Sequence, residues 1–138
     1  LKNLSFMVSH EGVQLAPFYD LLSIATYDSP AFDKIGWPEQ TQLAWPILGV
    51  RHFSNINRGV LLESGASLNL AKGTADRLLE NLRGRIVAEA QTLCAEVETE
   101  NAEIVRVRPE LAATMAGEIR CVRAIVHTVL KEMAKQIA

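Results

Sequence analysis

Two oxygen-bearing side chains near the start of the chain could together hold a divalent metal ion. Asn3 precedes a short apolar run at residues 4–8, and Asp20 follows a second β-prone run at residues 13–15. The Ser-His-Glu-Gly sequence between the two runs is typical of a hairpin turn. An antiparallel hairpin brings its two ends side by side, so we expect Asn3 and Asp20 to lie close together. An amide and a carboxylate suit Mg²⁺, which fills its remaining positions with water and phosphate oxygens.

Two short segments around these residues resemble motifs of the HipA-like serine/threonine kinases. In that family an Asp-x-His-x-Lys-Asn segment precedes a hydrophobic hairpin, and a Pro-x-Tyr-Asp-Leu segment follows it. Here Leu1-Lys2-Asn3 is similar to the end of the first motif, and Pro17-Phe18-Tyr19-Asp20-Leu21 is similar to the second. The likeness continues loosely over residues 1–100, which include Leu43-Ala44-Trp45-Pro46-Ile47.

The resemblance implies a function for the two candidate ligands. Asn3 and Asp20 would bind Mg²⁺ and, through it, ATP, with Asp20 in the role of the aspartate of the protein-kinase Asp-Phe-Gly motif. The γ-phosphoryl group of ATP would pass to a serine or threonine of a protein substrate. The family also implies a toxin paired with a HipB-like DNA-binding antitoxin, with aminoacyl-tRNA synthetases among the family's targets.

The chain departs from the family pattern at its beginning. The catalytic Asp and the His of the first motif would lie upstream of Leu1, and the nucleotide-binding N-terminal lobe is missing. The first residue is Leu, and an apolar strand is predicted almost directly after it. We therefore expect a piece of a longer protein, namely part of a C-terminal kinase lobe. With no catalytic residue in this chain, the piece alone should be inactive.

Composition sets broad limits on the class of protein. The chain has 138 residues, of which 49% are hydrophobic and 22% charged, as expected for a single globular domain spanning residues 1–138. A net charge of −2 gives no electrostatic reason to expect direct nucleic-acid or membrane binding. No apolar run is long enough to span a bilayer. Cys94 and Cys121 lie in helical patterns and indicate buried thiols in a reducing, cytoplasmic compartment.

Hydrophobic spacing predicts a mainly α fold with one short N-terminal hairpin. Residues 1–50 should form the hairpin and a region like the metal-binding and activation loops of a kinase, and residues 51–138 a helical subdomain. Ser54 or Asn55 should cap a short helix that runs to about residue 64 and is ended by Gly65. Trp37 and Trp45 are candidates for the core or for a contact between subdomains.

Two long helices should dominate the C-terminal part. The first is predicted over residues 72–98, with an internal Gly84 that marks a close helix contact or a bend, and the second begins at Pro109. Residues 99–108 fit either a loop or an early start of the second helix. We expect the apolar stripes of the two helices to bury against each other and against the hairpin region.

The same residues also permit other interpretations. Asn3 and Asp20 are common turn and cap residues, so the hairpin could be purely structural. The chain would then be a non-catalytic helical interaction module, whose long helices dock a partner or a second copy in a homo-oligomer. A kinase-family member without activity is a third alternative. His52 is expected at the surface, and His127 as a hydrogen-bonded histidine at the edge of an apolar stripe.

Overall fold

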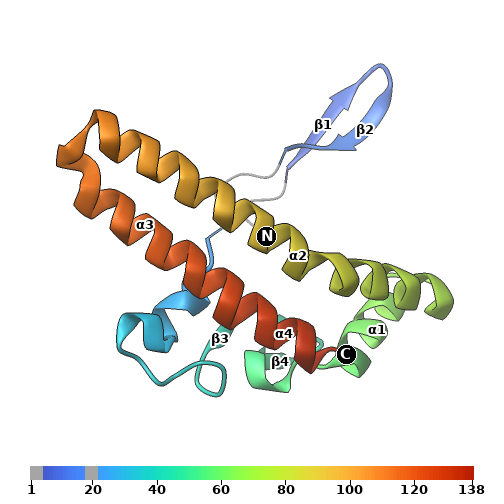
Figure 1. The fold of residues 1–138 in the computed structure, drawn as a ribbon. Helices are drawn as coiled ribbons and strands as arrows, with labels where there is room; N and C mark the ends of the chain where they lie inside the picture. The colour runs from blue at the N-terminus through green and yellow to red at the C-terminus, as the bar shows by residue number, and fades with distance from the viewer. Residues whose placement is uncertain (1–4, 18–21) are drawn as a thin grey trace.

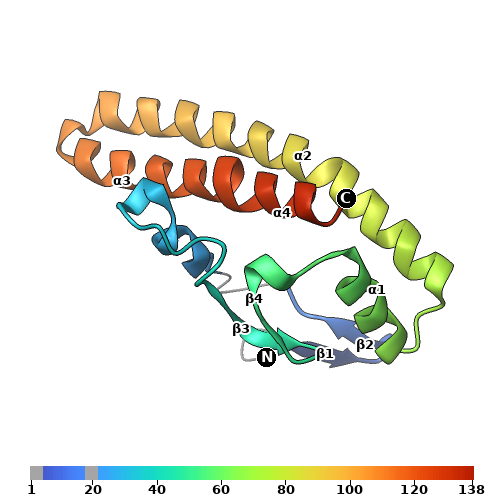
Figure 2. The same cartoon turned by 90° about the horizontal axis from the view of Figure 1, so that it is seen from below.

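Two long antiparallel helical runs form the body of the protein. The computed structural model describes residues 5–17 and 22–138. Helix α2 (Lys72–Val107) is 36 residues long. It packs along a second run made of α3 (Ala112–Ala124), the π-helical turn η5 (Ile125–Leu130) and α4 (Lys131–Gln136). Figures 1 and 2 show the two runs side by side, and Figure 2 shows the smaller elements on one side of them. Helices make up 65% of the described residues, so the prediction of a mainly α fold is confirmed.

The predicted boundary between the long helices is wrong in one respect. The second run begins as predicted, with the 3₁₀ turn η4 (Pro109–Leu111). Residues 99–107, however, are neither a loop nor part of that run, because α2 continues through them. Glu103 pairs with Arg106 one turn later at 2.7 Å, which supports these last turns. The helix ends at Val107 since the following residue, Arg108, precedes a proline and is disfavoured in helical geometry.

Helix α1 (Arg58–Ser67) begins and ends later than its sequence signals indicate. Residues Phe53–Asn55 form the 3₁₀ turn η3, and the cap is Asn57, whose side chain accepts a 3.1 Å hydrogen bond from the Val60 amide. Gly65 does not end the helix but lies buried within it. A Cβ atom at Gly65 would stand 3.0 Å from the Cβ of Ala75 on α2. The absence of a side chain at Gly65 therefore allows α1 and α2 to approach each other closely.

Within the described residues, four strands form two separate antiparallel hairpins. Strands β1 (Phe6–Ser9) and β2 (Gly12–Leu15) pair in the register Phe6↔Leu15 and Ser9↔Gly12, which confirms the predicted N-terminal hairpin. Gly12 has a φ of +114°, a conformation that favours glycine. Strands β3 (Gln42–Ile47) and β4 (Val50–His52) form the second hairpin. The β1–β2 hairpin projects from the helical body, and all its residues are exposed (Figure 1).

The core lies where the chain before β3 meets the C-terminal run. The 3₁₀ turns η1 (Ile24–Asp28) and η2 (Pro30–Phe32) lead to Trp37, which is 7% exposed and packs with Ala25 and Val129. The indole Nε1 of Trp37 donates a 2.5 Å hydrogen bond to Glu132 Oε2 on α4. The prediction that Trp37 is a core residue is confirmed. Trp45 is 69% exposed on β3, so the same prediction for Trp45 is wrong.

The apolar stripe predicted along α2 is only partly buried. Leu78, Leu82 and Leu93 each expose more than half of their surface. Over its first turns α2 contacts the short helix α1, which covers less of it than a second long helix would. A Cβ atom at Gly84 would meet nothing within 4 Å, so this glycine marks no close helix contact.

A cluster of ion pairs fastens α1 to α2. The Arg58 guanidinium donates to Asp76 Oδ1 at 2.6 Å and to Glu80 Oε1, and Glu80 also accepts from Arg83 at 2.8 Å. Hydrogen bonds from Arg83 and Arg58 lower the pKa of Glu80 below its ordinary value of 4.5. Hydrogen bonds to Glu80 and Asp76 raise the pKa of Arg58, which therefore stays charged.

This cluster predicts an acid-dependent stability difference. A carboxyl with a lowered folded-state pKa stabilises the fold wherever it is ionised, and loses that contribution as the pH falls through its folded pKa. The stability advantage of the wild type over Glu80→Gln should be full at neutral pH and should decrease progressively as the pH falls below 4.5 towards the lowered folded-state pKa. Urea unfolding of both proteins at pH 7, 5 and 3 measures it. An advantage that stays constant down to pH 3 would contradict the assignment.

Candidate functional site

The hairpin that carries the predicted metal ligands has the expected geometry in its described part. Asn3 and Asp20 both lie outside the described residues, so their side chains are not placed. Between them, the pairing of β1 with β2 continues one step further, because the Ala16 amide donates a 2.8 Å hydrogen bond to the Ser5 carbonyl. The two chain ends therefore leave the hairpin side by side, at Ser5 and Ala16.

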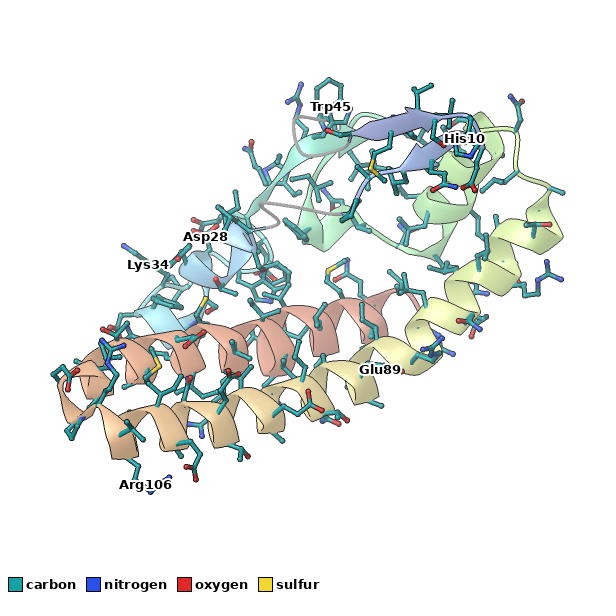
Figure 3. The ribbon with its side chains drawn as sticks, turned by 90° about the horizontal axis from the view of Figure 1, so that it is seen from above. His10, Asp28, Lys34, Trp45, Glu89 and Arg106 are labelled. Carbon is teal, nitrogen blue, oxygen red and sulfur yellow. The ribbon has the colours of Figure 1, made fainter. Side chains whose placement is uncertain are left out.

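A mostly apolar hollow of about 390 Å³ lies between residues 22–25 and strand β3. The residues that follow Asp20 form one wall, and β3 forms another. The hollow is lined by Leu22, Ser23, Ile24, Ala25, Gln42, Leu43, Ala44, Trp45, Phe53 and Val129. Trp45 projects from β3 on the side away from the two long helices (Figure 3). None of these described lining residues is ionisable, so the described walls suit an apolar side chain or ring and contribute no acid or base.

The histidines form no metal site among the described residues. No group of three or more His, Cys, Asp or Glu side chains within residues 5–17 and 22–138 could hold a metal ion. His10 lies at the exposed tip of the first hairpin (Figure 3), 3.9 Å from Glu11. His52 is half-buried rather than fully at the surface, with its Nε2 3.5 Å from Gln42 Nε2. His127 is exposed on η5 and forms no side-chain hydrogen bond with a described residue, so the expectation of a bonded boundary histidine is wrong.

The two cysteines are free thiols in different surroundings. Cys94 is buried on α2 and Cys121 is half-buried on α3. Burial, together with the nearby Glu98 carboxylate, raises the pKa of the Cys94 thiol. Since the thiolate is the nucleophile, Cys94 is poorly suited to nucleophilic chemistry at neutral pH. Of the predicted pair of buried thiols, only Cys94 is fully buried.

A group of basic residues on the C-terminal run was not singled out by the sequence analysis. Arg120, Arg123 and His127 line one hollow between this run and η2. Their spacing of three and four residues places them on one helical face, which is the signal that could have found them. A pattern of histidine with nearby acidic or thiol residues indicates a metal or catalytic site, and a group made mainly of arginines does not fit that pattern.

Comparisons of the chain with protein-family models, with curated proteins and with solved structures found no match. The resemblance to HipA-like kinases therefore stays a prediction from the two short motifs. Among the described helices, none combines the length and the apolar character needed to cross a membrane.

Proposed function

We propose that the chain is part of the C-terminal lobe of a HipA-like protein kinase, in which Asn3 and Asp20 hold Mg²⁺ against the phosphates of ATP. The observation that carries the proposal is the register of the β1–β2 hairpin, which ends with Ser5 beside Ala16. Asn3 is two residues from Ser5, and Asp20 is four residues from Ala16. Extended residues span up to about 3.5 Å each, so the connections allow both side chains to reach one ion.

The donor set suits the proposed group. One amide and one carboxylate oxygen leave most positions of Mg²⁺ for water and phosphate, as in phosphoryl-transfer sites. When bound, the metal would neutralise charge that develops on the phosphates during transfer to a serine or threonine. The apolar hollow beside Leu22 and Trp45 could receive a side chain of the protein substrate. The proton of the attacking hydroxyl would be accepted by an aspartate in a longer parent protein.

The proposal is tested by replacing Asp20 in that longer protein. Asp20→Asn keeps the size of the side chain and removes its charge, so Mg²⁺-dependent turnover of ATP should be abolished. Melting behaviour should change little. Glu96→Gln is the matched control, because Glu96 is exposed on α2, outside residues 1–50, and the loss of one negative charge there should leave turnover unaltered. Normal turnover by Asp20→Asn, in a protein that melts as the wild type does, would refute the metal role.

A separate measurement concerns the 138-residue chain alone. Without the upstream base and lobe it should catalyse no measurable transfer of phosphate from ATP to protein. Incubation of the pure chain with radiolabelled ATP and Mg²⁺ measures this. Incorporation of label above that of a heat-denatured sample would show that the reaction needs no upstream residue.

A non-catalytic helical interaction module is the second candidate function. The observation that favours it is the exposure of Leu78, Leu82 and Leu93, each above 50%, along α2. Such an incompletely covered apolar stripe is a common feature of helices that dock partners. The Asp20→Asn experiment separates the two candidate functions. Turnover of ATP by a kinase should depend on Asp20, whereas partner binding by an interaction module should not.

A further inference from the structure

A hollow of about 480 Å³ lies between the C-terminal helical run and the turn η2. Arg120 and Arg123 of α3 and His127 of η5 line it, and Ala31 of η2 forms part of the opposite wall. Figure 3 shows the loop that carries Asp28 and Lys34 over the α3 side of the helical pair. No Asp or Glu is among the described residues that line the hollow. Its size falls within the range of small-ligand pockets, roughly 300–1,000 Å³.

Both arginines are held in place by a neighbouring group. The guanidinium carbon of Arg120 lies 4.8 Å from the centre of the Phe32 ring, within the range of a cation–π contact. Phe32 is itself supported by the edge of Tyr27, with ring centroids 4.9 Å apart. The Nε atom of Arg123 donates a 2.8 Å hydrogen bond to Glu98 Oε1. These contacts restrict the two side chains before any ligand arrives, which reduces the entropy lost on binding.

The same contacts leave most donors of the basic group unused. Within residues 5–17 and 22–138, no guanidinium nitrogen of Arg120 forms a hydrogen bond or an ion pair. The terminal nitrogens of Arg123 are also without such partners in these ranges, since only its Nε is bonded. Glu98 neutralises one of the two arginines, so the hollow keeps a net positive charge from Arg120. Planar guanidinium groups with free donors match the oxygens of a phosphate group well.

We propose that this hollow, between η2 and the face formed by Arg120, Arg123 and His127, is a binding site for a phosphate group, either free or esterified to a small molecule. The phosphate oxygens accept hydrogen bonds from the two guanidinium groups, and His127 adds a third donor. Ala31 and Ile119 supply apolar wall on which the carbon atoms of an ester can rest. The site is independent of the proposed kinase function, because it uses neither Asn3 nor Asp20.

The test is a titration of the 138-residue chain in buffer that contains EDTA and no added metal. Inorganic phosphate and glycerol 2-phosphate are added at constant ionic strength, and binding is followed by calorimetry and by the arginine side-chain signals in NMR spectra. We expect saturable binding of at least one of them, with shifts of the Arg120 and Arg123 signals. Tighter binding of glycerol 2-phosphate assigns the site to an ester, and equal or tighter binding of inorganic phosphate assigns it to the free ion.

Three variants test the residues. Arg120→Gln and Arg123→Gln should each weaken binding by about tenfold or more, because each loses charge-assisted hydrogen bonds. Arg85→Gln is the matched control, since Arg85 is exposed on α2 and pairs only with Glu89 at 3.0 Å among the described residues. It should bind phosphate as the wild type does. Melting curves identify any variant that fails to fold.

A fourth variant distinguishes a ligand site from a merely structural pair. Glu98→Gln keeps a side-chain oxygen that can accept the hydrogen bond from Arg123 Nε, and it removes the negative charge that competes with phosphate for Arg123, so binding should become several-fold tighter. An absence of saturable binding, or wild-type affinity in both arginine variants, would overturn the proposal. Weaker binding by Glu98→Gln would equally count against it.

Discussion

Replacing Trp37 by alanine should lower the free energy of unfolding by about 3–5 kcal/mol, the typical cost of removing a large buried aromatic side chain. Trp37 is 7% exposed and joins three segments that are distant in sequence. Its ring lies against Ala25, Val129 and the Phe53 ring, the last with centroids 5.1 Å apart. Its Nε1 also donates to Glu132. The variant would thus lose both the packing and the link between η1, η3 and α4.

Two further variants separate the causes of this loss. Trp37→Phe keeps an aromatic ring but loses the hydrogen bond to Glu132, so it should fall between the wild type and Trp37→Ala. Trp45→Ala is the matched control, because Trp45 is 69% exposed and its loss should change stability by no more than about 0.5 kcal/mol. Urea unfolding followed by far-UV circular dichroism measures all three. Equal losses for Trp37→Ala and Trp45→Ala would mean that Trp37 is not the centre of the core.

The same substitution at two helical glycines should have opposite effects. Gly65→Ala places a methyl group 3.0 Å from the Cβ of Ala75, so α1 and α2 must move apart. Overpacking of this kind costs about 1–3 kcal/mol, which exceeds the gain of up to ~1 kcal/mol from the better helix propensity of alanine. We expect a net loss of about 1–2 kcal/mol on this balance. Gly84→Ala meets nothing within 4 Å and should gain about 0.5–1 kcal/mol.

A double variant tests the proposed contact directly. Ala75→Gly removes the methyl group that the new side chain would meet, so the double variant Gly65→Ala with Ala75→Gly should lose less than the sum of the two single losses. Thermal and urea unfolding give the required free energies. Additive losses, or a stabilising Gly65→Ala, would show that the helices are not in close contact at this point.

Much of the fold follows from local sequence signals, and the errors have identifiable causes. The β1–β2 hairpin and the start of the second run at Pro109 are correct because a turn sequence and a proline each act on the residues beside them. Gly65 was wrongly predicted to end α1, because glycine occurs both at helix ends and at close helix contacts. Trp45 is exposed although it is large and apolar, because burial depends on which segments pack against β3.

The candidate site could be predicted less completely than the fold. The hairpin register that supports the metal proposal follows from residues 6–15, whereas Asn3 and Asp20 themselves lie outside the described residues. The hollow beside Trp45 and the basic group around Arg123 depend on long-range contacts between segments far apart in the chain. Spacing along one helix can place Arg120 and Arg123 on one face, but it cannot indicate that η2 lies opposite them.

Because α2 is longer than the second helical run, its first turns are stabilised by other interactions than the rest of the helix. Helix α2 spans roughly 54 Å at 1.5 Å per residue, whereas residues 112–136 span only about 37 Å. The overhanging start of α2 is held mainly by α1 and by the half-exposed charges of Arg58, Asp76 and Glu80. Dissolved salt screens such charges. Concentrated salt should therefore weaken the attachment of the first turns of α2, whereas the apolar cluster around Trp37 should be little affected.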